Sequence, residues 1–161
     1  MGCGKTLTAK FISEKLKLNL IDTDFEIEKA KNMNIFEIFQ KYGESYFRHL
    51  ETEILKSLQE VCNSVIATGG GIFVENDENS KLAKSNGTIV FLDTPFEICW
   101  NRIKNSNRPL IFNNSVDNVK RLYKKRQKIY RRVADISIIN PKSSIACANE
   151  LIRRIEKGDM E

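Results

Sequence analysis

The 161-residue sequence is poor in cysteine, histidine, proline and tryptophan, and these shortages narrow the possible classes of protein. Its four cysteines, Cys3, Cys62, Cys99 and Cys147, are scattered, and no two of them have the spacing of a metal or redox motif. Together with His49, the single histidine, they make a poor set of zinc ligands. We therefore expect reduced thiols and a cytoplasmic location.

Long hydrophobic runs and a strong charge of one sign are also missing. No apolar run reaches the roughly 18 residues that indicate a membrane-spanning helix, so we expect no membrane partner. The net charge is +5, from 26 basic and 21 acidic residues, and no block of Lys and Arg is interleaved with aromatic residues. We therefore expect no nucleic-acid partner. As explanations of the excess of basic residues, we favour a solvated surface first and a polyanionic small-molecule ligand second.

The sequence does contain an alternation of short apolar runs with longer amphipathic segments, within a length that fits one domain. The predicted strands are residues 18–21, 65–68, 88–92 and 135–139, and helices are predicted from Thr6 onwards, over 35–58 with a break near Gly43, and over 146–157. Strands that alternate with helices indicate a parallel sheet covered by helices on both faces. We predict a single α/β domain over residues 1–161.

The first residues carry a phosphate-binding motif. The run Gly2-Cys3-Gly4-Lys5-Thr6 matches the end of a loop in which a glycine-rich turn opens a helix. The backbone N–H groups of such a turn bind phosphate, the lysine reaches the β- and γ-phosphate oxygens, and the hydroxyl binds Mg²⁺. The alternative is a chance Gly-Lys-Thr ahead of a helix. Further along the chain, Arg102 is our candidate for contact with the adenine face.

Two carboxylates follow the first predicted strand. Asp22 and Asp24 are separated by one residue at its carboxyl end, where open α/β sheets place their ligands. If both lie on the strand, they share a face and point into one site. One would then support Mg²⁺ through water, and the other would accept a proton or hydrogen bond from a substrate hydroxyl. The alternative is that Asp22 caps the following helix while Asp24 is solvated.

Two further motifs suggest a ligand that carries a carboxylate and hydroxyl groups. Arg48 and Glu51 are three residues apart on a predicted helix. They form either an exposed ion pair or a guanidinium that Glu51 orients towards a carboxylate ligand. The glycines at 69–71 directly follow a β-branched strand and suggest that backbone approaches a ligand, with a flexible turn as the alternative.

Two more arginines are candidates. Arg108 lies in a polar segment, about residues 103–118, that we interpret as a mobile flap over the nucleotide. An arginine there would neutralise charge on the transferred phosphoryl group. Arg126 lies on a basic helix, and if it points inwards it completes a clamp with Arg48 on a substrate carboxylate. For both residues, a solvated surface arginine is the alternative.

The order and spacing of these motifs resemble shikimate kinase, a family in the nucleoside monophosphate kinase-like branch of P-loop proteins. The resemblance runs from residue 1 to about 141 and rests on five ordered signatures: Gly-x-Gly-Lys-Thr, Asp-Thr-Asp, Phe-Arg-x-x-Glu, Gly-Gly-Gly, and Arg-Pro-Leu followed by Arg-x-x-x-Tyr. It implies a three-layer α/β/α fold with a lid at about 103–118 and shikimate-binding helices at about 25–58. It also implies transfer of the ATP γ-phosphoryl group to the 3-hydroxyl of shikimate. We expect a monomer.

The resemblance implies a role for each matching residue. The loop from Gly2 to Leu7, with Arg102 and Arg108, would bind ATP, and Thr6 and Asp22 would hold Mg²⁺. The catalytic residues would be Lys5, Asp24 and Arg108, with Asp24 orienting or deprotonating the attacking hydroxyl. The substrate-binding residues would be Asp24, Arg48, Gly70, Gly71 and Arg126.

The sequence departs from the family's pattern at its start. The family's loop begins with a further glycine, preceded by the first and central strand of the sheet, and Met1 stands just before the second glycine. We therefore expect the central strand to be missing from this chain, through truncation or a misplaced start codon, and activity to be low if the chain is this short. The alternatives are an inactive relic that binds nucleotide or metabolite, and another small-molecule kinase such as gluconate kinase.

Overall fold

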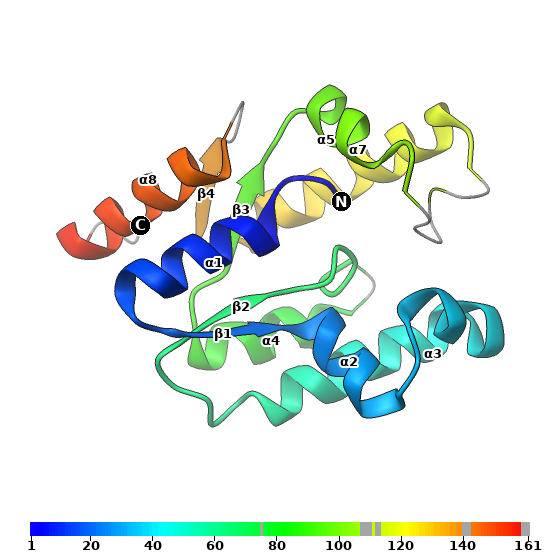
Figure 1. Ribbon diagram of the computed structural model, residues 1–161, viewed down its shortest axis with the longest axis horizontal. Helices are drawn as coiled ribbons and strands as arrows, with labels where there is room; N and C mark the ends of the chain where they lie inside the picture. Colours follow the sequence, from blue (N-terminus) through cyan, green and yellow to red (C-terminus); the bar gives the residue numbers. More distant parts are fainter. Residues whose placement is uncertain (75, 107–110, 112–113, 140–142, 159–161) are drawn as a thin grey trace.

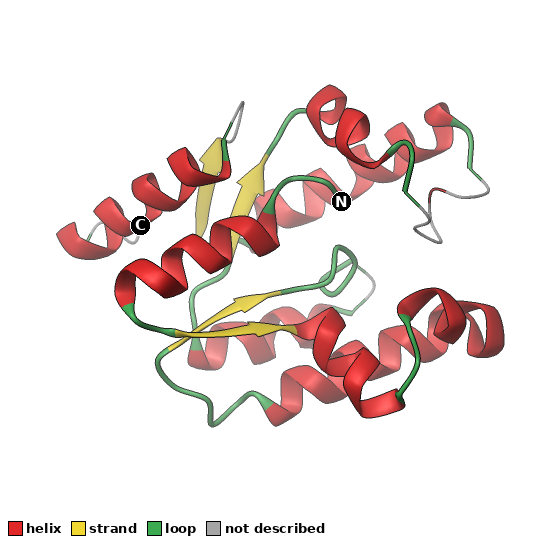
Figure 2. Ribbon diagram, in the orientation of Figure 1, coloured by secondary structure: helices red, strands yellow, loops and turns green. Residues whose placement is uncertain are grey.

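The structure is a computed structural model that describes residues 1–74, 76–106, 111, 114–139 and 143–158. Helices and short strands alternate along the chain, as predicted (Figures 1 and 2). The elements are α1 (Lys5–Leu16), β1 (Asn19–Asp22), α2 (Thr23–Lys31), α3 (Ile35–Ser57), β2 (Ser64–Ala67), α4 (Asp77–Asn86), β3 (Val90–Asp93), α5 (Phe96–Ile103), α7 (Val116–Val133), β4 (Ile136–Ile139) and α8 (Ser144–Lys157).

The four described strands form two separate parallel pairs. Strand β1 pairs with β2, and β3 pairs with β4. Within the described ranges, β2 and β3 do not pair with each other, and Figure 1 shows the two pairs as distinct sheets. The parallel α/β arrangement is confirmed, and no strand lies between β2 and β3 in the part of the chain that the structure describes.

An apolar cavity of about 340 Å³ lies between the two sheets, and we call it the seam. The helix α1 and the facing strands contribute part of its apolar lining, including Ala9, Ile12, Val65, Ala67, Val90 and Leu92. Because β2 and β3 each have one edge on the seam, backbone N–H and C=O groups on those edges lack the sheet partners that a third strand would give them. The seam is therefore a part of the core where apolar packing is loose and strand edges lack hydrogen-bond partners in the sheet.

Helices cover both faces of the strands. On one face, Ile12 of α1 packs with Leu92 of β3, Ile138 of β4 and Leu151 of α8 in a single core cluster. On the other face, where Figure 1 shows α3 and α7, a second cluster contains Leu55 of α3 together with side chains of the segment after β2 and of α7. These apolar faces give the three-layer arrangement expected of strands that are buried on both sides. No described helix is both long enough and apolar enough to span a membrane.

The helices α2 and α3 form a small subregion at one end of the molecule. Asn34 caps α3 by accepting a hydrogen bond from the backbone N–H of Glu37, whose own side chain accepts from the backbone N–H of Asn34. The predicted break at Gly43 is confirmed, because this residue has φ 80° and ψ 173° inside α3. Ile27 of α2 is buried against Ile38 and neighbouring side chains of α3. This packing fixes the position of the helices that carry the acidic and basic candidates.

The helix α4 is an element that our sequence analysis did not predict. Its segment, Asp77–Asn86, has only Leu82 and Ala83 as apolar residues, so its hydrophobic periodicity is weak. The N-cap of α4 was a usable sequence signal, because Asn76 is a favoured capping residue and accepts a hydrogen bond from the N–H of Glu78. Recognition of this cap would have indicated the helix.

Candidate active site

The amino-terminal glycines form a tight turn that leads into α1. Gly2 has φ 68° and Gly4 has φ 93°, both in the left-handed region that glycine adopts without strain. A Cβ built on Gly2 would lie 2.6 Å from the carbonyl oxygen of Cys99, so a larger residue does not fit there. The helix begins directly at Lys5. Because the first N–H groups of a helix have no partner within it, this turn and helix end provide donors and a favourable dipole for an anion.

Three segments distant in sequence hold this loop in place. Arg102 of α5 donates from Nη1 to the Gly2 carbonyl at 3.0 Å, and Thr94 donates from its hydroxyl to the Cys3 carbonyl at 3.3 Å. The Ser144 hydroxyl, at the start of α8, lies 3.5 Å from the Gly4 carbonyl. The structure places Arg102 beside this loop, and its predicted contact with adenine stays a prediction.

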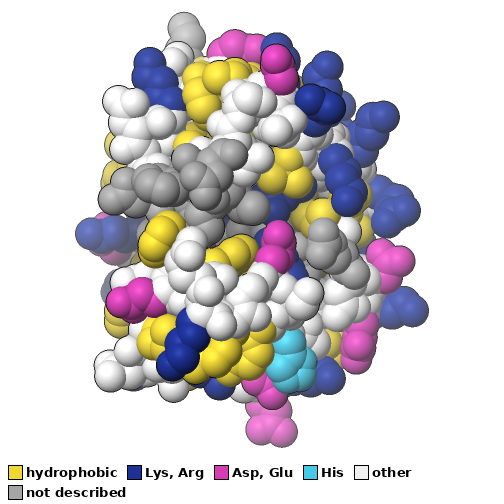
Figure 3. Space-filling model, turned by 90° about the vertical axis from the view of Figure 1, so that its right-hand side faces the viewer, with side chains coloured by type: hydrophobic (Ala, Val, Ile, Leu, Met, Phe, Trp, Pro, Cys, Tyr) yellow, Lys and Arg dark blue, Asp and Glu magenta, His cyan; other side chains and the backbone are white. Residues whose placement is uncertain are grey.

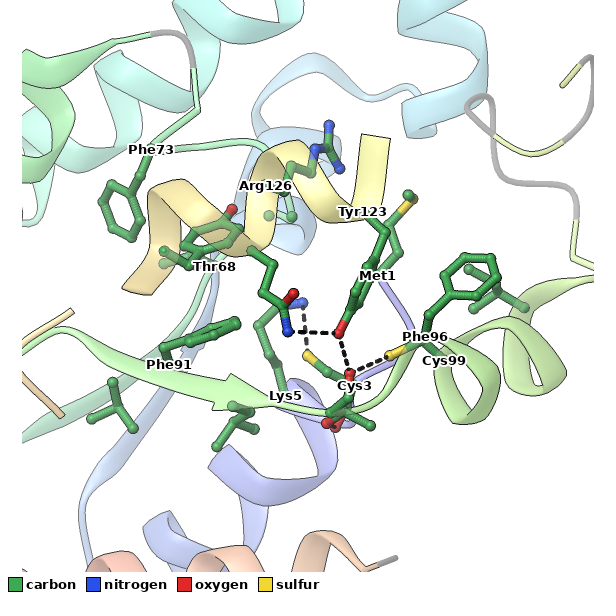
Figure 4. A pocket seen from close by; sticks show the side chains of 18 of the residues that line it. Met1, Cys3, Lys5, Thr68, Phe73, Phe91, Phe96, Cys99, Tyr123 and Arg126 are labelled. Carbon is green, nitrogen blue, oxygen red and sulfur yellow. Dashed lines mark hydrogen bonds between the residues drawn. The ribbon is translucent and has the colours of Figure 1, made fainter. Parts of the chain in front are cut away.

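The side chain of Lys5 lies within the loop. Its Nζ donates to the Cys3 Sγ at 3.9 Å (Figure 4). Burial alone would raise the pKa of the Cys3 thiol, but the Lys5 ammonium, the N-terminal amine and backbone hydrogen bonds together outweigh this effect and lower that pKa. Leu7, the last residue of the predicted loop, is 52% exposed on the first turn of α1.

Thr6 and Asp22, the two predicted metal-binding residues, are neighbours. The Thr6 hydroxyl donates to Asp22 Oδ2 at 3.1 Å, and the other carboxylate oxygen of Asp22 accepts the N–H of Asp24 at 3.1 Å. A hydroxyl beside a carboxylate is an oxygen donor set of the kind that Mg²⁺ prefers, and this ion commonly keeps several waters. Among the residues that the structure describes, no group of three or more His, Cys, Asp or Glu could hold a metal. The site therefore fits an ion that relies on few protein ligands.

The prediction that Asp22 and Asp24 share one face of a strand is wrong. β1 ends at Asp22, which caps α2, and Asp24 already lies in the first turn of that helix. The competing interpretation was correct for Asp22, whose side chain accepts from a backbone N–H at the helix start. The strand-to-helix change sends the two side chains to different places. Asp22 faces Thr6, and Asp24 lines a second cavity.

This second cavity, of about 380 Å³, collects the predicted substrate-binding residues, and we call it the substrate cavity. Helices α2, α3 and α7 and the glycine segment after β2 each contribute to its wall. Basic and acidic side chains lie side by side near the centre of the face shown in Figure 3. The predicted residues that line the cavity are Asp24, Arg48, Gly70, Gly71 and Arg126.

Arg48 is held in the wall of this cavity by two carboxylates of its own helix. Its Nη1 lies 2.5 Å from Glu51 Oε2, and its Nη2 lies 2.6 Å from Glu44 Oε1. Burial by itself lowers the pKa of Arg48, but the two glutamates outweigh it and raise that pKa above its ordinary value. A Cβ on Gly71 would overlap the Arg48 guanidinium, so only glycine permits this approach. Arg48 is thus a charged group of fixed orientation.

Glu51 is completely buried, at 0% exposure. Burial raises its pKa to about 7, although the adjacent Arg48 acts to lower it. Its Oε1 makes no hydrogen bond with a described residue. A Cβ on Gly69 would lie 2.5 Å from that oxygen and 2.8 Å from Asp24 Oδ1, which places two carboxylates around one glycine. The exposed ion pair that we held as the alternative is therefore excluded.

Arg126 is a buried cation beside the cavity. Its side chain is 6% exposed, and none of its guanidinium nitrogens makes a hydrogen bond or ion pair with a described residue. Burial lowers its pKa. A Cβ built on Gly70 would lie 3.6 Å from Arg126 Nη1, so the guanidinium adjoins the glycine segment. Glu44 and Glu51 act to raise the pKa of Arg126 but make no ion pair with it, so an anionic ligand in the cavity would supply a direct partner.

One predicted residue cannot be compared with the structure, and some residues of the site were not predicted. Arg108 lies outside the described residues, as does part of the predicted flap. Glu44, which pairs with Arg48, was missed by the sequence analysis, although its i,i+4 spacing was a usable signal. The aromatic residues Phe39 and Phe47 also line the substrate cavity, and helical periodicity marked them only as apolar.

The fold and the site together define a class of protein. A glycine turn that opens α1, an oxygen pair beside it, and an adjoining cavity with fixed arginines describe a P-loop kinase that acts on a small molecule. The comparisons with known proteins narrow this class. The sequence profile described as "Shikimate kinase" matches residues 1–156. The chain belongs to the shikimate kinase family.

Relatives and solved structures agree with this assignment. The chain is 43% identical over 152 residues to a shikimate kinase of Macrococcus caseolyticus, covering 94% of this chain and 89% of the relative. It resembles the crystal structure of shikimate kinase from Aquifex aeolicus with a TM-score of 0.85 and 38% identity, covering 99% and 94% of the two chains. A shikimate kinase from Acinetobacter baumannii, solved in complex with shikimate, gives a TM-score of 0.92 at 33% identity, covering 100% and 91%.

Proposed function

We propose that this chain transfers the γ-phosphoryl group of ATP to the 3-hydroxyl of shikimate, producing shikimate 3-phosphate and ADP. The observation that carries the proposal is Arg126, whose buried Nε makes no hydrogen bond with a described residue and which lies with Arg48 and Asp24 on the wall of one cavity. A ligand with one carboxylate and several hydroxyl groups suits two arginines, an aspartate and exposed glycine backbone. Shikimate has this chemistry.

In this proposal, the glycine turn and the first N–H groups of α1 bind the phosphates of ATP, and Lys5 leaves Cys3 to reach the transferred group. Phosphoryl transfer depends mainly on positioning and on stabilisation of charge, which these groups provide. Arg102, which donates a hydrogen bond to the Gly2 carbonyl, is proposed to border the nucleotide base. Arg108 is proposed as a further cation over the phosphates.

Thr6 and Asp22 are the residues that would hold Mg²⁺. When bound, this ion would neutralise charge on the phosphate oxygens. The Thr6 hydroxyl lies 3.1 Å from Asp22 Oδ2, so both oxygens can contact one ion. Asp22 also caps α2, which ties its position to that of Asp24 on the same helix.

Asp24 is proposed to hold and deprotonate the attacking hydroxyl. It lies on the wall of the substrate cavity, beside the glycine segment that would meet the ring hydroxyls. A positioned carboxylate contributes to catalysis by accepting the proton as the new bond forms. Arg48 and Arg126 are proposed to bind the shikimate carboxylate, and Glu51 keeps Arg48 in orientation. A monomer in the cytoplasm remains our prediction.

A coupled assay of ADP release tests the proposal. We expect ADP to form when ATP and shikimate are both present, and shikimate 3-phosphate to accumulate in equal amount. When gluconate replaces shikimate, ADP should form no faster than it does from ATP alone, without any acceptor. If calorimetry shows that shikimate binds but no ADP is released, the non-catalytic relic is favoured instead. If the chain neither binds shikimate nor releases ADP, the proposal is contradicted.

A further inference from the structure

The helix α7 carries Arg126 into the substrate cavity, and a polar network on a neighbouring face of the same helix attaches it to β3. Tyr123, Gln127 and Arg131 recur every four residues, so they form one stripe along α7. Arg126 lies one residue from this stripe. The position of Arg126 therefore depends on what the stripe contacts.

The stripe contacts the carboxyl end of β3. Gln127 donates from Nε2 to Asp93 Oδ1 at 2.7 Å. Arg131 donates to Asp93 Oδ2 from Nε at 2.9 Å and from Nη2 at 2.7 Å. Asp93 thus receives hydrogen bonds on both oxygens from two successive turns of α7. Its side chain is only 14% exposed, which strengthens these charge-assisted hydrogen bonds relative to an open surface pair.

The network continues to the nucleotide loop. The Tyr123 hydroxyl donates to the carbonyl of Thr94 at 2.7 Å, and Gln127 also donates to that hydroxyl at 3.1 Å (Figure 4). Burial, followed by the nearby Asp93, raises the pKa of Tyr123 to about 12, so it stays a donor. The Thr94 hydroxyl in turn donates to the Cys3 carbonyl. A continuous set of hydrogen bonds therefore joins α7, the end of β3 and the phosphate-binding turn.

Apolar and directional contacts both hold α7. Val119 and Val133 are buried near its two ends. Between them, Ile129 and Tyr130 pack against a buried core cluster, and the Tyr130 ring stacks on Phe91. Apolar contacts are non-directional and allow a helix to turn or slide slightly, whereas two parallel N–H···O bonds to one carboxylate are directional. Asp93 supplies this directional contact within the half of the helix that follows Arg126.

We propose that Asp93 is a positioning residue for the substrate site: through Gln127 and Arg131 it sets the rotation of α7, and thereby the place of the Arg126 guanidinium relative to the nucleotide loop. This inference rests on the proposed function, in which Arg126 binds the substrate carboxylate. Asp93 itself does not touch the substrate. Its effect falls on shikimate binding and leaves the nucleotide site intact.

The chain offers a matched pair of variants as a test. Arg131 and Arg132 are adjacent on α7, their side chains are 60% and 69% exposed, and each pairs with one aspartate, Asp93 or Asp77. Only the first of these pairs leads to β3. Arg131→Gln should weaken shikimate binding roughly tenfold or more, towards the about hundredfold that a displacement of 1 Å can cost. Arg132→Gln should leave shikimate binding unchanged, and both variants should bind ADP as the parent protein does.

Two further variants separate positioning from general stability. Arg131→Lys retains the charge but loses the fork of donors, so its shikimate affinity should lie between those of the parent and Arg131→Gln. The double variant Asp93→Asn/Arg131→Gln should bind shikimate no more weakly than the more affected single variant, because both changes break the same Asp93–Arg131 contact. Calorimetric titration with shikimate and with ADP, together with thermal unfolding of each variant, supplies the measurements.

The outcomes are distinct. If the parent chain does not bind shikimate, the proposed function fails and this inference fails with it. If the parent binds shikimate and Arg131→Gln behaves like Arg132→Gln, only the inference is overturned. It is also overturned if Arg131→Gln weakens shikimate and ADP binding equally while lowering the unfolding temperature, since that pattern indicates general destabilisation.

Discussion

The substrate cavity is lined by charged and polar groups, several of which have partners, whereas the seam between β2 and β3 is lined mainly by loosely packed apolar side chains. Around the substrate cavity, Arg48 is paired with two carboxylates, and the glycine segment is held by the Gly69 N–H, which donates to the buried Thr23 hydroxyl at 3.0 Å. In the seam, apolar side chains surround about 340 Å³ of space, and two strand edges face it. One region is preorganised for a ligand, and the other is incompletely packed.

The difference shows that the substrate-binding wall does not depend on a continuous sheet. Its side chains come from α2, α3, α7 and the segment after β2, which pack on one another through their own clusters. The stability of the whole chain, however, depends on the core that the seam interrupts. Binding of shikimate and global stability should therefore respond to different changes.

The largest expected effect concerns chemistry at the substrate cavity. Asp24→Asn should lower turnover about 10²–10⁴-fold while sparing nucleotide binding, because the amide cannot accept the proton of the attacking hydroxyl. Steady-state kinetics with ADP titration checks this. Glu26→Gln is the control, since Glu26 lies on the same helix but is not among the residues that line the cavity. Full activity in Asp24→Asn would remove this residue from the catalytic role.

Arg126→Met should raise the shikimate KM by about 10–100-fold, because a charge-assisted contact with the carboxylate is lost. The same change removes a buried cation that has no partner in the described residues, so the ligand-free variant should unfold at the same temperature or higher. Lys125→Met, at the adjacent exposed position, is the control. A large fall in unfolding temperature for Arg126→Met would show that the arginine is mainly structural.

The seam should respond to an added strand. Fusing about five β-branched residues, followed by a glycine and one further residue, ahead of Met1 should raise the free energy of unfolding by at least about 2 kcal/mol, as strand edges gain partners and apolar space is filled. For a chain of this size, that corresponds to roughly 4–8 °C in Tm. A Gly/Ser extension of equal length is the control. Equal Tm values for both fusions would mean that the seam does not accept a strand.

The last effect is a pH dependence at Glu51. Burial raises its pKa from 4.5 to about 7 in the folded protein, so the folded state binds a proton more tightly than the unfolded chain. The stability contribution of Glu51 is therefore fully present below pH 4.5 and declines as the pH rises to about 7. Arg48, Glu44, Asp24 and Arg126 are the charged groups around it.

Thermal unfolding across this pH range, compared between the parent chain and Glu51→Gln, measures the effect. The difference in Tm should shift in favour of the variant as the pH rises, because the amide does not ionise. A difference that stays constant from pH 4.5 to 7 would show that Glu51 titrates normally in the folded protein.

Local patterns in the sequence predicted most of the elements. The helix after the glycine turn, the four strands and the break at Gly43 all follow from signals within a few residues, such as β-branched runs and a glycine inside a helical period. The α4 helix was missed because it buries little apolar surface. The placement of Asp24 was wrong because β1 ends at Asp22, two residues earlier than the strand argument required.

The sequence by itself determined the order of the elements, the phosphate-binding turn and the types of charge available, since each depends on neighbouring residues. Only the tertiary structure decided that Arg126 is buried without a partner, that Glu51 is fully enclosed, and that Asp93 holds α7. These properties arise when segments distant in sequence come together, as Gly4 and Ser144 do across 140 residues. Burial and the loss of water then set the strength of each charge, and no local pattern specifies them.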